Sequence, residues 1–369
     1  MNTNNPMNEK GPSHIVVNRI LERSVYCNDI MDTAISLKEQ IEQTQDENAL
    51  LELNKKLQLL IDRQLKLKEY TISLHETFRT IPHRSERLQR ASEHFYRGEF
   101  PEMDQALDDV AIFEEIDRLE EDFYKETDEE RKEKLRIRLR RRSYELIVKA
   151  LYRYTFVENP EWYKDVYRLL EKARDASFNV HTLYELAAYL RLTDELDWAF
   201  ELLDDASVMA DDLEGEACKL YKAKSFWAMG AIASKRKDYP KNIEHTGKAL
   251  TLYTELSEQD PAEYREEVAN MMSIIGDSHG LSDNFPVALL IFEEVAKIRR
   301  ELSLLHGNPE YALHLADTLD KLAIVHTRLD ENREAVECLE EALRIKDDNV
   351  DYNLYSLLES KANTLAKLV

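Results

Sequence analysis

The sequence predicts an all-α protein in which helix pairs stack into an open, right-handed α-α superhelix, preceded by an N-terminal helical hairpin. Helix breakers are scarce: the 369 residues include 8 Gly and 9 Pro, while 33% of the residues are charged. Few breakers together with abundant Glu, Lys, Leu and Ala favour helix along the whole chain. No segment shows the alternation of β-branched residues that is typical of a strand. In the C-terminal half, one pattern of small and bulky residues recurs, which indicates a repeat protein.

The N-terminal region divides into a polar tail and a helical segment. Residues 1–14 are rich in Asn and Pro and lack the apolar core of a signal peptide, so we expect a disordered tail. Residues 15–80 carry apolar side chains at helical spacing, and the polar stretch 44–48 interrupts them. This pattern predicts two antiparallel helices in a coiled-coil-like hairpin that could join two copies of the chain. One continuous helix is the alternative.

The next region, residues 85–157, is predicted to hold degenerate helical repeats and one highly charged helix. Gly98 ends a helix and Pro101 opens the next. Residues 114–133 are mostly acidic, and a basic stretch follows them. The candidate basic patch is Arg136, Arg138, Arg140, Arg141 and Arg142. Such a stripe could contact an acidic protein or a nucleic acid. We favour the simpler interpretation, a solvated helix neutralised by the acidic segment, because apolar residues interrupt the arginines.

Residues 158–369 contain the repeats. A large apolar residue followed by a small one recurs in successive predicted helices, and the small residues are Ala187, Gly230, Gly276 and Ala323. Their separations are 43, 46 and 47 residues. Small side chains let two helices approach closely, and bulky residues farther along fill the space between pairs. The spacing therefore predicts an open solenoid whose later units have longer helices.

These repeats resemble the tetratricopeptide repeat family, in particular the long-helix variety of kinesin light chains and their bacterial relatives. The segments 308–311, 318–323 and 340–345 carry the resemblance. It covers residues 179–369 well and extends weakly back to residue 85, whereas the N-terminal hairpin lies outside it. Residues 362–369 closely copy residues 316–323, so the segment from Tyr352 to Val369 is either a capping helix, which we favour, or the first helix of a unit cut from a longer protein.

The resemblance implies that the first helix of each pair lines a concave groove that binds a protein or peptide. The predicted groove residues are Tyr184, Arg191, Lys224, Trp227, Asn270, Asp277, Asp317 and Asp320. We expect Trp227 to anchor the partner, because buried aromatic residues dominate binding hot spots. Structural packing of Trp227 is an equal alternative. Basic residues of the partner would face Asp317 and Asp320.

Composition and motifs disfavour most other functions. The formal net charge of −23 argues against general binding to nucleic acids or anionic membranes. Three scattered cysteines without a CxxC pair argue against a disulfide framework or zinc site and favour a cytoplasmic protein. His279 and His326 occupy equivalent repeat positions, where aromatic packing is more plausible than metal binding. No catalytic motif is present, so we predict no enzymatic activity, no cofactor and no metal.

Two functional classes remain open. The favoured class is an adaptor, in which the repeats bind a partner while the N-terminal hairpin self-associates or docks elsewhere. The alternative is a regulatory or sensor protein that controls an effector enzyme, such as a protease or a defence system, or that senses a peptide. The hairpin discriminates between the two, because in a sensor it should pack back on the rest of the chain.

Overall fold

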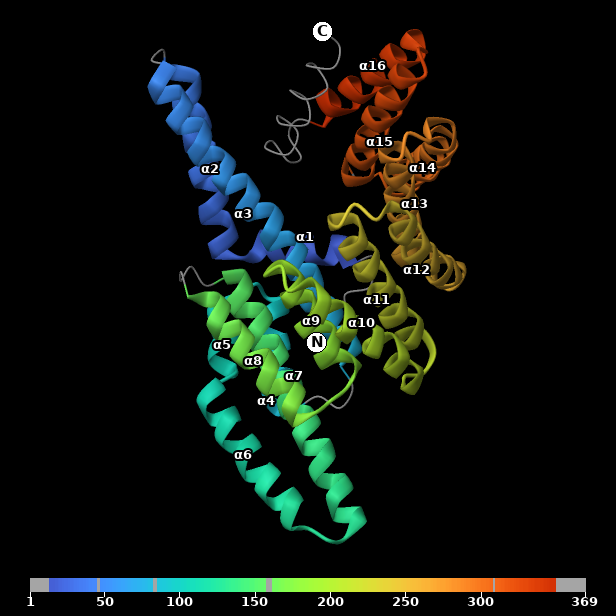
Figure 1. Cartoon of the computed structure of the whole chain (residues 1–369). Coiled ribbons are helices and arrows are strands. Elements are labelled where there is room, and N and C mark those ends of the chain that lie inside the picture. Colours follow the sequence, from blue (N-terminus) through green and yellow to red (C-terminus); the bar gives the residue numbers. More distant parts are fainter. Residues whose placement is uncertain (1–12, 45–46, 82–84, 157–160, 308, 350–369) are drawn as a thin grey trace. The chain divides into compact units, whose positions relative to one another are not determined.

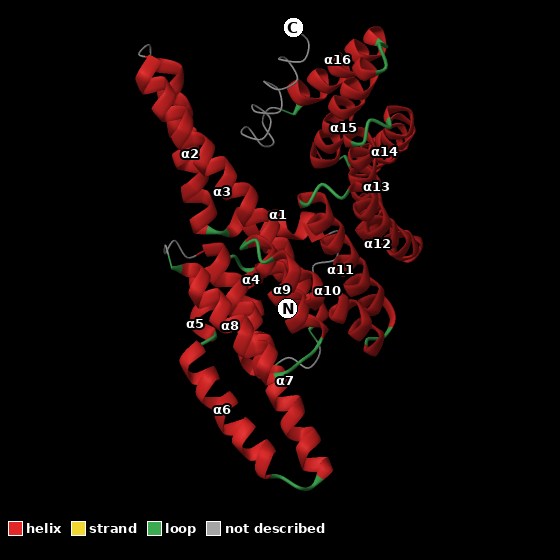
Figure 2. Cartoon of the chain, viewed as in Figure 1, coloured by secondary structure: helices red, strands yellow, loops and turns green. Residues whose placement is uncertain are grey.

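The computed structural model describes residues 13–44, 47–81, 85–156, 161–307 and 309–349. Every regular element in these ranges is a helix (Figure 2), which confirms the all-α prediction. The chain divides into two compact units, Met1–Leu202 and Leu203–Val369, and the boundary falls inside α10 (Leu196–Met209). No helix in the described ranges has both the length and the apolar character needed to cross a membrane.

The first unit begins with three helices where the sequence predicted two. They are α1 (Ser13–Arg23), α2 (Val25–Gln43) and α3 (Glu47–Thr80). The additional break lies at Ser24, whose side chain accepts a hydrogen bond from the backbone N–H of Cys27 and so caps α2. Because α1 starts at Ser13, the last two residues of the predicted tail are helical, and the rest of the tail lies outside the described residues.

The C-terminal part of α3 packs on the helices that follow it. Phe78 is buried against Phe95 of α4 (Glu86–Tyr96), with ring centroids 5.2 Å apart. His75 Nδ1 lies 3.1 Å from the Tyr96 hydroxyl oxygen. The predicted hairpin of α2 and α3 therefore does not stand free at its base, because one of its helices belongs to the core of the first unit.

The rest of the first unit is built from helix pairs of unequal length. The elements are α5 (Phe100–Ala106), α6 (Asp109–Lys125), α7 (Glu129–Phe156), α8 (Trp162–Ala176) and α9 (Val180–Leu192). The second half of α7 is buried from Ser143 to Ala150, whereas its first half is mostly exposed. That exposed half forms a hairpin with α6 that projects from the body of the unit (Figure 1).

The second unit is a stack of helices in sequence order. After the short helix η2 (Ala210–Asp212), it contains α11 (Gly215–Lys235), α12 (Tyr239–Gln259), α13 (Pro261–Leu281), α14 (Phe285–His306), α15 (Pro309–Arg328) and α16 (Asn332–Asp348). Each of these six helices packs on the next one along the chain (Figure 1). This order confirms the predicted α-helical solenoid. The capping or truncated helix predicted at 352–369 lies outside the described residues.

The small residues of the repeat pattern lie where helices cross closely. Ala187, Gly230, Gly276 and Ala323 are all buried. A Cβ atom added to Gly276 would lie 2.8 Å from Phe292 Cε1, and one added to Gly230 would lie 2.6 Å from Thr246 Oγ1. At these two positions the partner helix occupies the space that a side chain would need.

A second repeated feature appears seven residues after each small residue. There the backbone adopts the left-handed conformation, with φ of 68° at Asp194, 58° at Lys237, 58° at Asp283 and 61° at Asp330. The next residue donates its N–H to the carbonyl five residues earlier, as Asp238 does to Ala233 at 2.9 Å. This is the Schellman arrangement that ends a helix. The same turn occurs at Gly98 between α4 and α5, so the repeat pattern reaches into the first unit.

Candidate partner-binding surfaces

The predicted groove residues lie on the first helices of the pairs, but they are divided between the two units. Lys224 and Trp227 lie on α11, Asn270 and Asp277 on α13, and Asp317 and Asp320 on α15. Tyr184 and Arg191 lie on α9 of the first unit. We call the exposed side chains of α11, α13 and α15 the first-helix face.

One lysine joins two helices of this face directly. The Lys321 Nζ of α15 donates to Ser273 Oγ at 2.8 Å and to Asp277 Oδ2 at 2.7 Å, both on α13. The same ammonium lies 5.6 Å from the ring centroid of Phe292. Side chains from consecutive first helices are therefore neighbours, as a shared binding surface requires. Asp277, predicted as an open acidic contact, is paired within the chain.

At the α11 end of the first-helix face, some residues predicted to contact a partner are instead packed inside the protein. Lys224 is buried, with its ammonium 5.6 Å from the ring centroid of Tyr221. Trp227 is partly buried and packs against the cluster that contains Tyr253 and Tyr264. Tyr184 in the first unit is also buried. Lys224 and Tyr184 are thus corrected to core positions, and Trp227 has a structural role.

A buried polar cluster centred on Arg299 joins α13, α14 and α15. Its guanidinium donates to Glu266 Oε1 at 3.1 Å, to Asn270 Oδ1 at 2.6 Å and to Thr318 Oγ1 at 2.8 Å. His314 Nδ1 lies 2.9 Å from Glu266 Oε1. Asn270, expected to face a partner, therefore has its carbonyl oxygen engaged by Arg299.

Burial and charge act in opposite directions on the two titratable groups of this cluster. Burial alone would lower the pKa of His314, but its interaction with Glu266 outweighs burial, so the pKa of His314 is raised. Burial alone would raise the pKa of Glu266, but His314 and Arg299 outweigh it, so the pKa of Glu266 is lowered. Both shifts favour the charged pair.

A second buried cation neutralises the predicted acidic end of the face. The Lys346 ammonium on α16 is fully buried and donates to Asp320 Oδ2 at 2.9 Å. It lies 3.8 Å from Asp317 Oδ1, whose side chain is 57% exposed. Asp320 is therefore a buried structural residue, which corrects its predicted role, and Asp317 is the acidic residue of this pair that a partner can reach.

Sequence reasoning did not identify Arg299 or Lys346, although a signal was present. The two residues are 47 residues apart, which is the spacing of the last two repeats. Each lies on the buried stripe of its helix, Arg299 with Val295 and Leu302, and Lys346 in line with Ala342. A cation on an apolar stripe predicts a buried, paired charge.

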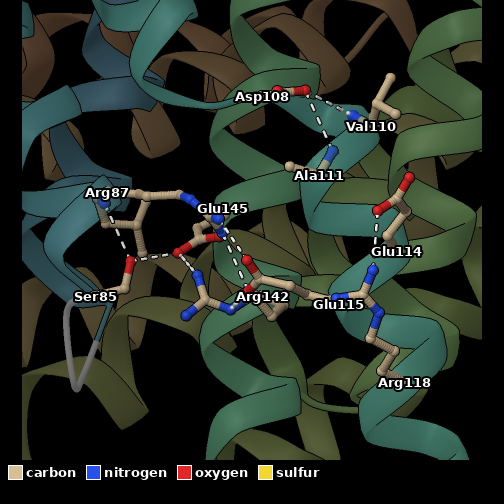
Figure 3. Close-up of polar contacts among 11 residues, drawn as sticks. Ser85, Arg87, Asp108, Val110, Ala111, Glu114, Glu115, Arg118, Arg142 and Glu145 are labelled. Carbon is tan, nitrogen blue, oxygen red and sulfur yellow. Dashed lines mark hydrogen bonds and ion pairs between the residues drawn. The ribbon is translucent and has the colours of Figure 1, made fainter.

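Part of the basic patch of the first unit forms ion pairs with carboxylates, including one on the acidic helix α6 beside it. Arg142 pairs with Glu145 on its own helix and with Glu115 of α6, at 3.0 Å from its Nε (Figure 3). Arg87 pairs with the same two carboxylates, and Ser85 also donates to Glu145, which is fully buried. This cluster ties α4, α6 and α7 together.

The other arginines of the patch differ in their partners. Arg136 pairs with Glu133 at 3.2 Å and lies 5.3 Å from the ring centroid of Phe123. The side chains of Arg138, Arg140 and Arg141 make no hydrogen bond or ion pair with any described residue. Arg138 and Arg140 are exposed and Arg141 is half-buried. Of the five predicted positions, these three have no ion-pair partner among the described residues, although the charge of Arg138 helps to lower the pKa of Glu115.

The two equivalent histidines stand in the repeated turns. His326 Nδ1 lies 2.7 Å from Glu331 Oε2, and His279 Nδ1 lies 3.4 Å from Asn284 Nδ2. Each histidine thus contacts the side chain five residues later, across the turn. Within the described residues, no group of three or more His, Cys, Asp or Glu side chains is arranged to hold a metal ion.

Comparison with known proteins agrees with this geometry. Residues 315–346, which span α15 and α16, match the model of the tetratricopeptide repeat. This stretch of the chain is therefore a tetratricopeptide repeat. BtubC (BKLC) from P. vanneervenii has the same kind of fold, with a TM-score of 0.50 and 15% identity over 66% of this chain and 91% of that chain. No curated protein matches the sequence.

Two further solved structures align over most of the chain. The apo form of RapI aligns with a TM-score of 0.49 and 13% identity over 93% of this chain and 79% of that chain. Aspartyl phosphate phosphatase F from Bacillus subtilis aligns with a TM-score of 0.48 and 13% identity over 97% of this chain and 81% of that chain.

Proposed function

We propose that this tetratricopeptide repeat protein is a non-enzymatic scaffold that binds a partner protein or peptide on the first-helix face of its second unit. One observation carries the proposal: Lys321 bridges α15 to Ser273 and Asp277 of α13, so consecutive first helices present one joined polar surface. Both helices of a pair also contribute packing residues, such as Phe292 of α14 and Leu319 of α15.

The chemistry of this face favours a partner segment with both a basic and an apolar residue. The carboxylate of Asp317 is 57% exposed, although it lies 3.8 Å from the Lys346 ammonium. Ile324, seven residues farther along α15, is 46% exposed. An exposed carboxylate and an exposed aliphatic side chain on one helix face suit an extended or helical peptide.

The test is partner capture from the native lysate, followed by mass spectrometry. The variant Asp317→Asn/Ile324→Asp changes the charge and the apolar contact of the first-helix face, while the buried Lys346 keeps its hydrogen bond to Asp320. The matched control, Arg333→Glu/Glu337→Lys, reverses an exposed ion pair on α16. The proposal predicts that a partner captured by the wild type and by the control is lost with the first-helix variant. Retention of every captured protein by both variants would refute it.

The regulatory alternative is favoured by the position of the N-terminal helices. Because Phe78 of α3 packs on Phe95 of α4, the N-terminal hairpin is anchored at its base to the rest of the first unit. In a regulator, partner binding would change the protection of this hairpin. Hydrogen exchange of α1–α3 in the full chain, with and without the captured partner, tests this: altered protection supports regulation, and unchanged protection favours the simple adaptor.

A further inference from the structure

The hairpin of α6 and the first half of α7 separates charge between its two helices. In α6, seven carboxylates against two cations give a charge of −5. In residues 129–142 of α7, eight cations against three carboxylates give +5. The sides that face each other are paired through Glu115 and Arg142 (Figure 3). Lys172 of α8 also pairs with Asp117 and Glu120 of α6, at 2.7 and 3.1 Å. Glu114 and Glu121 lie outside these contacts, and their ion-pair partners among the described residues are Arg118 and Lys125 of the same helix.

The outer side of α6 is an acidic stripe with apolar ends. Glu114, Asp117 and Glu121 lie at helical spacing on one face, and their side chains are 62%, 64% and 72% exposed, although Asp117 also pairs with Lys172 of α8 at 2.7 Å. Val110 and Tyr124 extend the same face at its two ends and are 65% and 84% exposed. Exposed large apolar residues that continue a charged stripe are typical of a contact surface.

The outer side of α7 is the complementary basic stripe. Lys134, Arg138 and Arg141 follow one another at spacings of four and three residues, so they share one face. Arg138 and Arg141 have no ion-pair partner among the described residues, and Arg141 Nε is buried without an acceptor. Each stripe covers eight residues, whose first and last Cα atoms are about 10 Å apart along the helix. The acidic stripe of one molecule therefore matches the basic stripe of another in length and charge.

We propose that the α6–α7 hairpin is a homotypic docking arm: two copies of the chain pair with α6 of each against α7 of the other. A two-fold axis makes both contacts at once, since each copy carries both stripes. The existing contacts Glu114–Arg118, Glu121–Lys125 and Lys134–Glu130 are exposed pairs of low strength, so exchanging partners costs little. The acidic stripe beside the arginines repels a polyanion, which favours a second copy of this chain over a nucleic acid.

The arm has a limited area, so the pairing is weak and depends on salt. The 17 residues of α6 extend about 25 Å. An interface of that length falls at the low end of specific interfaces. Exposed charges are screened over about 8 Å at physiological ionic strength, so added salt weakens the dimer.

The test is sedimentation velocity of the full chain over a range of protein concentrations at low and high salt. Lys134→Glu/Arg138→Glu makes both stripes acidic, and Glu114→Lys/Glu121→Lys makes both basic. Each variant alone should raise the dissociation constant by at least about tenfold. An equimolar mixture of the two variants should dimerise again, because every stripe then meets its opposite. The control Lys241→Glu/Lys248→Glu places the same charge change on exposed α12 positions and should dimerise like the wild type.

Three results would overturn the proposal. The first is a wild-type chain that stays monomeric at every concentration and salt. The second is a mixture of the two variants that stays monomeric although the wild type dimerises. The third is a dimer that both variants leave intact, with Lys134→Glu/Arg138→Glu instead abolishing the binding of a labelled single-stranded oligonucleotide, which would assign the arginines to nucleic acid.

Discussion

The substitution Gly276→Ala tests whether close helix crossing holds the repeats together. In the folded chain the new Cβ would lie 2.8, 3.0 and 3.2 Å from three carbons of the Phe292 ring. Contacts below 3.0 Å are essentially never formed by real Cβ atoms. Phe292 is 2% exposed and belongs to the core cluster of α14, α15 and α16, so its ring has no free space to enter.

The magnitude follows from two opposing effects. Overpacking a well-filled core costs about 1–3 kcal/mol. Replacing glycine by alanine inside a helix recovers about 1 kcal/mol of helix propensity. We therefore expect Gly276→Ala to lower the free energy of unfolding by about 1 kcal/mol. The control is Gly280→Ala, four residues along the same helix, where no atom lies within 4 Å of the new Cβ. That variant should gain up to about 1 kcal/mol.

Urea denaturation followed by circular dichroism measures both variants, and the difference between them isolates the overpacking cost of about 1–3 kcal/mol. In a melting experiment, each kcal/mol corresponds to about 2–4 °C for a domain of this size. Phe292→Leu should be less harmful in the Gly276→Ala background than in the wild type, with a coupling energy of at least about 0.5 kcal/mol. Equal stability of Gly276→Ala and Gly280→Ala would refute the idea that the crossing is tight.

Three further predictions concern turns and buried charges. Lys237→Gly should stabilise the chain by about 1 kcal/mol in urea denaturation, because Lys237 has a φ of 58°, which strains a residue with a Cβ atom. Lys346→Met should destabilise it by about 3–5 kcal/mol, because Asp320 is then buried without its cation; a loss below about 1 kcal/mol would contradict this. The raised pKa of His314 means that its stabilising effect is complete below about pH 6.5 and is lost as the pH rises through the higher folded pKa. His314→Gln should therefore lower the melting temperature more at about pH 6 than at about pH 9, and an equal loss at both would count against the pair with Glu266.

The fold could be predicted because it depends on local patterns. Small residues at Ala187, Gly230, Gly276 and Ala323 recur at similar spacing, and each proves to be buried, with Gly230 and Gly276 directly against the next helix. The break at Ser24 could not be predicted with the same ease, because no Gly or Pro marks it. A single serine hydroxyl that caps α2 separates it from α1, and serine is common inside helices as well.

The candidate surface was harder to predict than the fold, because burial of a charged side chain depends on a partner in another helix. Asp320 is on the first helix, as expected, but Lys346 of α16 covers it. Asn270 faces Arg299, which is 29 residues away in the sequence. Helical periodicity places a residue on a face, yet it does not say which cation reaches that face from the neighbouring helix.

The repeats are therefore alike in their backbone and different in their buried polar contacts. The position twelve residues after the small residue is alanine in three units, Ala199, Ala288 and Ala335, but it is Asn242 in the unit of α11 and α12. Its amide Nδ2 donates to the Gly230 carbonyl at 2.7 Å, and its Oδ1 accepts from Ser278 at 2.6 Å, so one side chain links α11, α12 and α13. Arg299 and Lys346 act in the same manner one and two units later, each with its own acceptors.

A buried polar contact is stable only with its own partners, so each set of contacts favours one neighbour for each helix pair. Apolar packing alone would permit any pair to stack on any other. We infer that the polar contacts specify the order of the stack and thereby hold the first-helix face in one arrangement.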